Sequence, residues 1–420
     1  MSVGLRLILM MVSAVSALSV HAQDAPQTLP ESLTLPVLIR LVAERSPRLA
    51  SERTAINAAE AERITAGVLP NPSVSYGRFR PSGGMNTLFD GSRQEQSTLD
   101  FPLLIAGQRG ARIEAADQGI LAARARVGAV GNELVLHASE MFVGLQAAQE
   151  KVVLLEESYA EIVRVVSVVS GRMESGMASR YDLARVELEL AAIAVRVDEA
   201  RSDRAGFSAG IASLIGAPGW RPNAVGTAGP AGLATDVAVW RELLAARNPG
   251  IQAARREEDT AQAAVKRAER ERWPVPVLNL GRSWTTDPFG AANLIGVTTE
   301  IPLFDTRLGP LEKAKADLRA AQRRREMIEA EVGVDLVRVL DTLVQKRAAL
   351  EQLERNVGTR IAALKQMAED SYRLGRGSIL ELIDSSRSRL DARLAGVDLR
   401  ATIVQHEYRI KALADKLVSN

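Results

Sequence analysis

The sequence predicts a mainly α-helical protein with a small β part, in which one unit of helix, two strands and helix occurs twice. Three observations predict this fold class. Proline, which breaks helix interiors, is absent from 103 to 217 and from 311 to 420, far longer than the average helix of about 11 residues. Both stretches carry apolar residues at helical spacing. Short alternating segments bounded by proline precede each stretch.

The composition excludes several classes of function. The 420 residues include 53 Lys and Arg against 51 Asp and Glu, and a net charge of +2 does not suit a protein that binds nucleic acid by neutralising phosphates. The chain has no Cys, which excludes disulfides, thiolate nucleophiles and Cys-ligated metals. His137 and His406 each lack a second ligand at metal spacing. We therefore expect no nucleic-acid partner, cofactor or bound metal.

Residues 1–22 are predicted to be a signal peptide. Arg6 precedes an apolar segment at 7–20, and Val20-His21-Ala22 offers the small residues at which a signal peptidase cleaves. The mature chain is therefore expected to begin at Gln23. No later segment has the roughly 20 apolar residues that a membrane-spanning helix needs. An exported chain of this kind is expected to be either soluble or a β-barrel.

The elements are expected in the following order. The first repeat, 23–215, is predicted to hold helices at about 32–68, strands at about 73–80 and 96–102, and long helices at about 105–172 and 178–215. A linker rich in Pro and Gly follows at 216–232. The second repeat, 233–420, is predicted to hold helices at about 236–273, strands at about 276–285 and 293–301, and long helices at about 308–374 and 378–417.

Heptads in both proline-free stretches predict coiled-coil packing of the long helices. In the first stretch an apolar residue recurs every seven positions, with a second set four residues further on. The second stretch repeats the pattern, although Arg347 and Glu354 interrupt it. The residues that recur every seven positions in the first stretch are Leu134, Met141, Ala148, Leu155, Ile162 and Val169. Those of the second stretch are Leu336, Leu343, Leu350, Val357 and Leu364.

The two halves of the chain are predicted to be a tandem duplication. The heptads beginning at Leu134 and Leu336 are offset by 202 residues. Similar offsets relate Ser46-Pro47 to Asn248-Pro249, and Asp100-Phe101-Pro102-Leu103 to Glu300-Ile301-Pro302-Leu303. An offset that drifts by so few residues across half a protein indicates a repeated unit.

Four strands in two hairpins cannot form a closed sheet on their own. In a bilayer, an open sheet edge leaves backbone groups unpaired at a cost of several kcal/mol each. If these strands span a membrane, several chains must therefore close one barrel together. A symmetric oligomer is thus a physical requirement of a membrane-spanning sheet.

Short motifs in a fixed order resemble those of the outer membrane factor family, also called the TolC family. They are Leu69-Pro70-Asn71-Pro72 before the first strand, Phe101-Pro102-Leu103 at the end of the second, and Gly107-Gln108-Arg109-Gly110-Ala111-Arg112 at the start of a long helix. The phrases around Pro72 and from Gly107 to Arg112 are most similar to the cobalt-zinc-cadmium resistance branch. The resemblance covers the whole mature chain.

The resemblance implies a homotrimer in the outer membrane of a Gram-negative bacterium. Each subunit of such a trimer gives four strands to a 12-stranded transmembrane β-barrel, and its long helices form an α-barrel through the periplasm. The family implies three partners: a periplasmic adaptor, or membrane fusion, protein, an inner-membrane pump of the resistance-nodulation-division type, and outer-membrane lipid. The implied function is passive conduction of divalent heavy-metal cations from periplasm to exterior, not catalysis.

The resemblance also suggests a periplasmic gate where the long helices turn back. Glu381 and Asp384 match two acids three positions apart in the second repeat, and Asp182 corresponds to Glu381 in the first repeat. In a trimer, rings of carboxylates there would favour cations. The alternative is an ordinary helix start, since acids favour the first turn after an N-cap. The suspected adaptor-contact tips are Gly176, Ser179 and Arg180 in the first repeat, and Gly375, Arg376, Gly377 and Ser378 in the second.

Other functions remain open from the sequence. An outer-membrane duct for drug efflux or type I protein secretion has the same architecture. A periplasmic coiled-coil adaptor or scaffold explains the heptads but not four alternating strands bounded by proline. An exported hydrolase is a further rival, but the sequence shows no arrangement of Ser, His and Asp that supports one.

Overall fold

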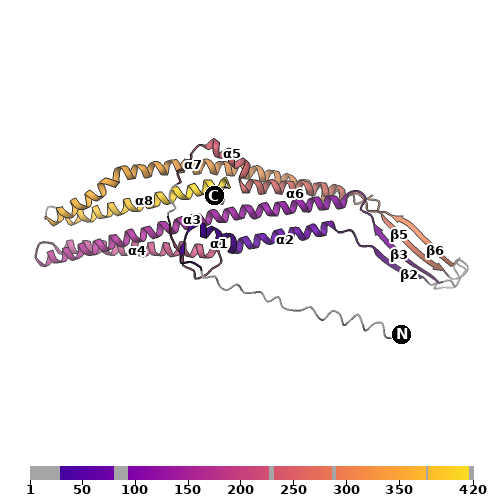
Figure 1. The fold of residues 1–420 in the computed structure, drawn as a ribbon, viewed down its shortest axis with the longest axis horizontal. Helices are drawn as coiled ribbons and strands as arrows, with labels where there is room; N and C mark the ends of the chain where they lie inside the picture. Colours follow the sequence, from indigo (N-terminus) through magenta and orange to yellow (C-terminus); the bar gives the residue numbers. More distant parts are fainter. Residues whose placement is uncertain (1–28, 80–92, 227–230, 286–289, 375–376, 416–420) are drawn as a thin grey trace, which may run out of the picture.

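The protein is an elongated molecule with a β-sheet at one end and two helix turns at the other (Figure 1). Its computed structural model describes residues 29–79, 93–226, 231–285, 290–374 and 377–415. The predicted signal peptide lies outside these residues. Two helices of more than 60 residues, one from each half of the chain, run most of its length.

Each half contains one long helix flanked by shorter ones. The first half consists of β1 (Ser32–Leu33), α1 (Leu35–Arg45), α2 (Pro47–Gly67), β2 (Ser73–Phe79), β3 (Gln94–Pro102), α3 (Gln108–Glu174), α4 (Arg180–Leu214) and β4 (Asn223–Ala224). The second consists of α5 (Val237–Arg247), α6 (Pro249–Glu271), β5 (Val277–Thr285), β6 (Gly290–Thr298), α7 (Leu308–Arg373) and α8 (Ile379–Leu413). The order of helices and strands therefore repeats, as the predicted duplication requires.

The short helices of each half break at a proline. Ser46 ends α1 and caps α2, because its hydroxyl accepts a hydrogen bond from the Leu49 amide and Pro47 occupies the first helical position. Asn248 does the same between α5 and α6, where its side-chain oxygen accepts from the Ile251 amide at 3.0 Å. Each of the ranges 32–68 and 236–273 therefore holds two helices. The small parallel pair β1 and β4, which lies partly in the predicted linker, was not predicted.

The heptad residues of α3 form the core. Leu134, Ala138 and Leu145 pack with α1 and the C-terminal end of α4, whereas Ile162 and Val169 pack with α4 and α8. In α7 the buried heptad residues run from Leu336 to Leu343, and Leu364, nearer the turn, is 52% exposed. The seams therefore bury apolar residues as the predicted coiled coil requires, except at Leu364 of α7.

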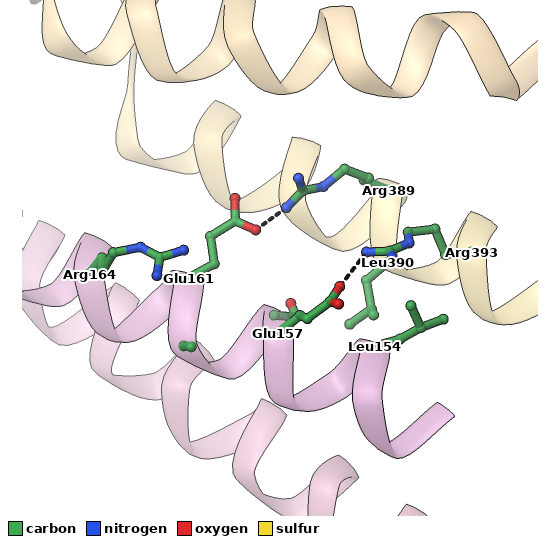
Figure 2. A pocket seen from close by; sticks show the side chains of 9 residues that line it. Leu154, Glu157, Glu161, Arg164, Arg389, Leu390 and Arg393 are labelled. Atoms are coloured by element: carbon green, nitrogen blue, oxygen red, sulfur yellow. Dashed lines mark hydrogen bonds and ion pairs between the residues drawn. The ribbon is translucent and has the colours of Figure 1, made fainter. Parts of the chain in front are cut away.

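A ladder of ion pairs joins the two halves between α3 and α8. Glu150, Glu157 and Glu161 on α3 pair with Arg400, Arg393 and Arg389 on α8. Steps of seven and then four residues along α3 are matched by the same steps backward along α8, which fixes the register of the antiparallel helices. Figure 2 shows the two pairs nearest the turns beside a hollow of about 360 Å³.

All four main strands form one antiparallel sheet in the order β2-β3-β5-β6. The two predicted hairpins are joined through β3 and β5, where Leu99 lies opposite Leu280. The last strand, Gly290–Thr298, begins and ends before the predicted 293–301. Strands of nine residues span about 30 Å at 3.3 Å per residue. None of the described helices contains a stretch apolar enough to cross a membrane.

The close contact of α3 with α4 can be tested at Gly144. A Cβ atom on Gly144 would lie 2.3 Å from the Phe207 ring, so Gly144→Ala is expected to destabilise the protein by about 1–3 kcal/mol through overpacking. Gly128→Ala on the same helix meets nothing within 4 Å and is expected to be neutral or stabilising by about 0.5–1 kcal/mol. Thermal unfolding followed by circular dichroism measures both, and equal midpoints would contradict the packing.

The ion-pair ladder can be tested by charge reversal. The Arg389–Glu161 pair has side chains only 15% exposed, so Arg389→Glu should cost about 3 kcal/mol and the added change Glu161→Arg should recover much of it. The Arg393–Glu157 pair is the control, because its side chains are 43% and 54% exposed and reversal of Arg393 should cost about 1 kcal/mol or less. Thermal unfolding of the single and double variants is the measurement. Equal losses at the two pairs count against the ladder.

Candidate functional site

The two helix turns at the end opposite the sheet are the candidate site, since the sequence places the suspected gate and tip residues there. In the first turn, α3 ends at Glu174 and Gly176 adopts a left-handed φ of 75°. The Met177 amide then donates to the Arg172 carbonyl at 2.7 Å, which closes the helix end. Glycine suits this position because the left-handed region has no steric cost for it.

Both turns then start the next helix in the same way. Ser179 and Ser378 are N-caps, and each forms a reciprocal capping box with the acid three residues on, Asp182 or Glu381. The Asp182 amide donates to the Ser179 hydroxyl at 3.1 Å, and the Glu381 amide to the Ser378 hydroxyl at 3.2 Å. Two of the three acids that the sequence singled out, Asp182 and Glu381, therefore have the same structural task, which is the ordinary helix-start role.

The second turn has little room for a side chain at Gly377. A Cβ atom there would lie 2.6 Å from the Ser371 hydroxyl and 3.1 Å from a carboxylate oxygen of Glu381. Gly377 therefore lets the chain pass close to the end of α7. Gly375 and Arg376, two further suspected tip residues, lie outside the described residues. Arg180 is exposed at the first position of α4.

Asp384 lies one turn beyond the cap and is exposed. Next to it on α8, Arg387 donates to Glu189 of α4 at 2.7 Å, and Glu189 is only 4% exposed. The hydrogen bond to Glu189 raises the pKa of the Arg387 guanidinium, and the nearby carboxylates of Asp391 and Asp384 raise it further. The Glu189–Arg387 pair therefore anchors the start of α8 to the first half of the chain. The sequence gives no local signal for this pair, because its two residues lie 198 positions apart.

A second contact links the turns themselves. Arg172 donates to the Tyr372 carbonyl at 2.8 Å, and its guanidinium lies 4.8 Å from the centre of the Tyr372 ring. Burial raises the pKa of the Tyr372 hydroxyl. The two residues line a groove of about 450 Å³ between the helix pairs, together with Val168, Met177 and Leu382. The groove is largely apolar, and the charged residues Glu161, Arg164 and Glu369 also line it.

What the described residues offer at this end is charge and shape. The described residues contain no group of three or more His, Cys, Asp or Glu placed to hold a metal ion. His406 is engaged with the Thr402 carbonyl at 2.8 Å, within its own helix. At this end the structure brings together the exposed acids Glu381 and Asp384, the half-buried acid Asp182, and two capping boxes, beside the cross-repeat ion pair of Glu189 with Arg387.

Comparisons with known proteins point to one family. The outer membrane efflux protein family matches residues 38–217 and 240–414, one match for each half of the chain. The cobalt-zinc-cadmium resistance protein CzcC of Cupriavidus metallidurans is 25% identical over 369 residues, covering 86% of this chain and 85% of that protein. The nickel-cobalt-cadmium resistance protein NccC of Alcaligenes xylosoxydans xylosoxydans is 26% identical over 347 residues, covering 79% and 72%.

The fold also matches solved structures. CusC, a protein described as forming a transmembrane channel, superposes with a TM-score of 0.75 at 18% identity, covering 90% of this chain and 91% of that one. The likeness confirms the predicted fold class of long helices with a small sheet, and the paired family match confirms the internal repeat. The chain therefore belongs to the outer membrane efflux protein family, whose members lie in the outer membrane of Gram-negative bacteria and extend into the periplasm.

Proposed function

We propose that this chain is the outer-membrane channel of a tripartite efflux pump, and that three copies conduct divalent heavy-metal cations passively from the periplasm to the exterior. The metal cargo is supported by the resemblance to CzcC and NccC, which are named for resistance to cobalt, zinc, nickel and cadmium. The channel is not an enzyme in this proposal, and its energy comes from an inner-membrane pump through a periplasmic adaptor.

The single observation that carries the proposal is the sheet, which has two different faces and two outer strands with one described neighbour each. One face, here the apolar face, exposes Val74 at 77%, Ile295 at 78% and Val297 at 68%. Such a face is costly in water and suited to lipid. The outer edges of β2 and β6 require partners in lipid, and a β6 edge of one subunit against a β2 edge of the next supplies them.

Apolar side chains continue from the sheet onto its base. Ile105 is 72% exposed, Leu303 74% and Phe304 fully so, all between the strands and the long helices. These three residues and the apolar side chains on the apolar face of the sheet together make a band tall enough for the apolar core of a membrane, roughly 25–30 Å. Arg78 and Glu95 pair at the far end of the same face, where the headgroup region begins in this arrangement.

The helices supply the periplasmic part of the channel. The 67 residues of α3 reach about 100 Å at 1.5 Å per residue. Both helix turns face the same way, away from the sheet, so they are the surfaces that an adaptor and pump meet first (Figure 1). We assign the adaptor contact to these tips: Gly176, Ser179, Arg180, Gly375, Arg376, Gly377 and Ser378.

The gate is proposed at the same tips. Asp384 and Glu381 are exposed and Asp182 is half-buried, and the carboxylates of Glu381 and Asp182 each accept a hydrogen bond from the amide of their own N-cap. A capping role and a gate role are compatible, because the cap uses one oxygen of the carboxylate and fixes the position of the group. In a trimer the three residues form rings that favour cations at the entrance.

Oligomeric state is the first test of this function. Three chains of 45.3 kDa, less the signal peptide, are expected in the detergent-extracted particle by light scattering coupled to size exclusion. Closure of the barrel requires this because a single chain leaves two sheet edges open. A monomeric particle, or release of the protein by osmotic shock as a soluble species, would falsify the channel.

Cargo is tested by deleting the gene in its own bacterium. Tolerance to cobalt, zinc or cadmium should fall several-fold, and a plasmid copy should restore it, because the metals then have no exit. Tolerance to a hydrophobic drug is the control and should not change. A loss of drug tolerance with unchanged metal tolerance would assign the channel to drug efflux instead.

The gate is tested by neutralising its acids without breaking the cap. Gln also completes a capping box, so Glu381→Gln with Asp384→Asn removes charge and keeps the helix start. In planar bilayers the double variant should lower the cation-to-anion permeability ratio by roughly twofold or more. Asp203→Asn, an exposed acid about 30 Å further along α4, is the control and should leave the ratio unchanged. An unchanged ratio in the double variant rejects the gate.

A further inference from the structure

The second face of the sheet, here the polar face, carries almost no charge. Side chains alternate along a strand and directly opposed residues share a face, so the register assigns every strand residue to one side. Arg78, Glu95 and Arg282 fall on the apolar face. The polar face is made mostly of small and uncharged polar residues, among them Ser73, Ser75, Gly77, Gln94, Gln96, Thr98, Asn279, Gly281, Ser283, Ala292, Gly296 and Thr298. Within the described strands, Asp100 is the one charged residue on this face.

Asp100 is held by a short chain of hydrogen bonds across the sheet. It lies opposite Ser73 on β2 and Asn279 on β5. The Asn279 Nδ2 group donates to Asp100 Oδ1 at 2.7 Å, and the Thr298 hydroxyl donates to Asn279 Oδ1 at 2.7 Å. Among the described residues, no hydrogen bond reaches the other carboxylate oxygen. The amide and hydroxyl therefore orient Asp100 while leaving one oxygen available.

We propose that Asp100 is a specificity-determining residue for cations, and that three copies form a ring of carboxylates inside the β-barrel. The inference rests on the proposed function, because only a barrel closed by three chains turns the polar face toward a lumen. Asp100 lies two residues before the end of β3, so the ring sits where the barrel meets the helices. Within the described strands, no cation on the same face compensates its charge.

The chemistry of the ring suits a divalent cation in transit. Carboxylate, amide and hydroxyl oxygens are hard ligands, and three carboxylates around a lumen concentrate cations without enclosing one. The residues paired with Asp100 straight across the four strands, here called the Asp100 row, are Ser73, Asn279 and Gly296, and none of them carries a charge. The ring therefore attracts cations and repels anions at a second point, separate from the helix tips.

The second repeat has no equivalent charge in the sheet. The duplication relates Asp100 to Glu300, but β6 ends at Thr298 and Glu300 is exposed beyond it. At the Asp100 row the same face of β6 carries Gly296. The acid in the sheet is therefore contributed by the first repeat alone, which gives three charges in a trimer.

The experiment is the reversal potential of the reconstituted wild-type trimer and its variants in planar bilayers under a potassium chloride gradient. Asp100→Asn should lower the cation-to-anion permeability ratio by about threefold or more, since it removes the ring charge and keeps the side-chain shape. Asn279→Asp adds a second acid to the same row and should raise the ratio. The cobalt concentration that blocks half of the potassium current should be several-fold higher in Asp100→Asn than in the wild type.

Glu95→Gln is the matched control, because it removes the same charge from the same strand on the opposite face and should leave the ratio unchanged. A wild-type protein that forms no trimer and no channel overturns the proposed function. If the wild-type protein forms a channel, and both Asp100→Asn and Asn279→Asp have the same cation-to-anion permeability ratio as the wild type, the ring alone is overturned. The variant Asn279→Asp supplies the answer even if Asp100→Asn fails to assemble.

Discussion

Backbone hydrogen bonding at the edges of one small sheet is the constraint on which this architecture depends. β2 and β6 have one described neighbour each, and the face between them exposes Val74 and Ile295. Lipid satisfies that face but not the edges, whereas in the proposed trimer the neighbouring chains pair with both edges. In the proposed trimer the need to close the sheet dictates symmetry, and symmetry turns each acid proposed at the helix tips or on the polar face into a ring.

The long helices transmit this arrangement over about 100 Å because their register is fixed twice. Apolar heptad residues of α3, such as Ile162 and Val169, bury the seam with α4 and α8. Ion pairs at matched steps, from Glu150–Arg400 to Glu161–Arg389, fix how α3 and α8 slide against each other. Apolar contact alone tolerates a shift by one heptad, whereas that shift would leave one Glu opposite an Arg in place of three.

At the helix tips, local folding and proposed function use the same residues. Glu381 and Asp182 stabilise the first turns of α8 and α4 through capping boxes, and their positions follow from that role. A sequence pattern of Ser followed three residues later by an acid is sufficient to predict such a cap. It is not sufficient to separate a cap from a gate, because both require a carboxylate at the same place. The contact of Arg172 with Tyr372 and the buried Glu189–Arg387 pair had no such pattern.

The sequence by itself determined the long helices, the four strands and the repeat, because each follows from local spacing or backbone chemistry. Only the tertiary structure decided that β3 pairs with β5, and that Glu161 pairs with Arg389. Only the register assigned Asp100 to an otherwise uncharged face. Contacts between residues more than a hundred positions apart depend on how two halves pack, and periodicity within either half carries no information about the relative shift between them.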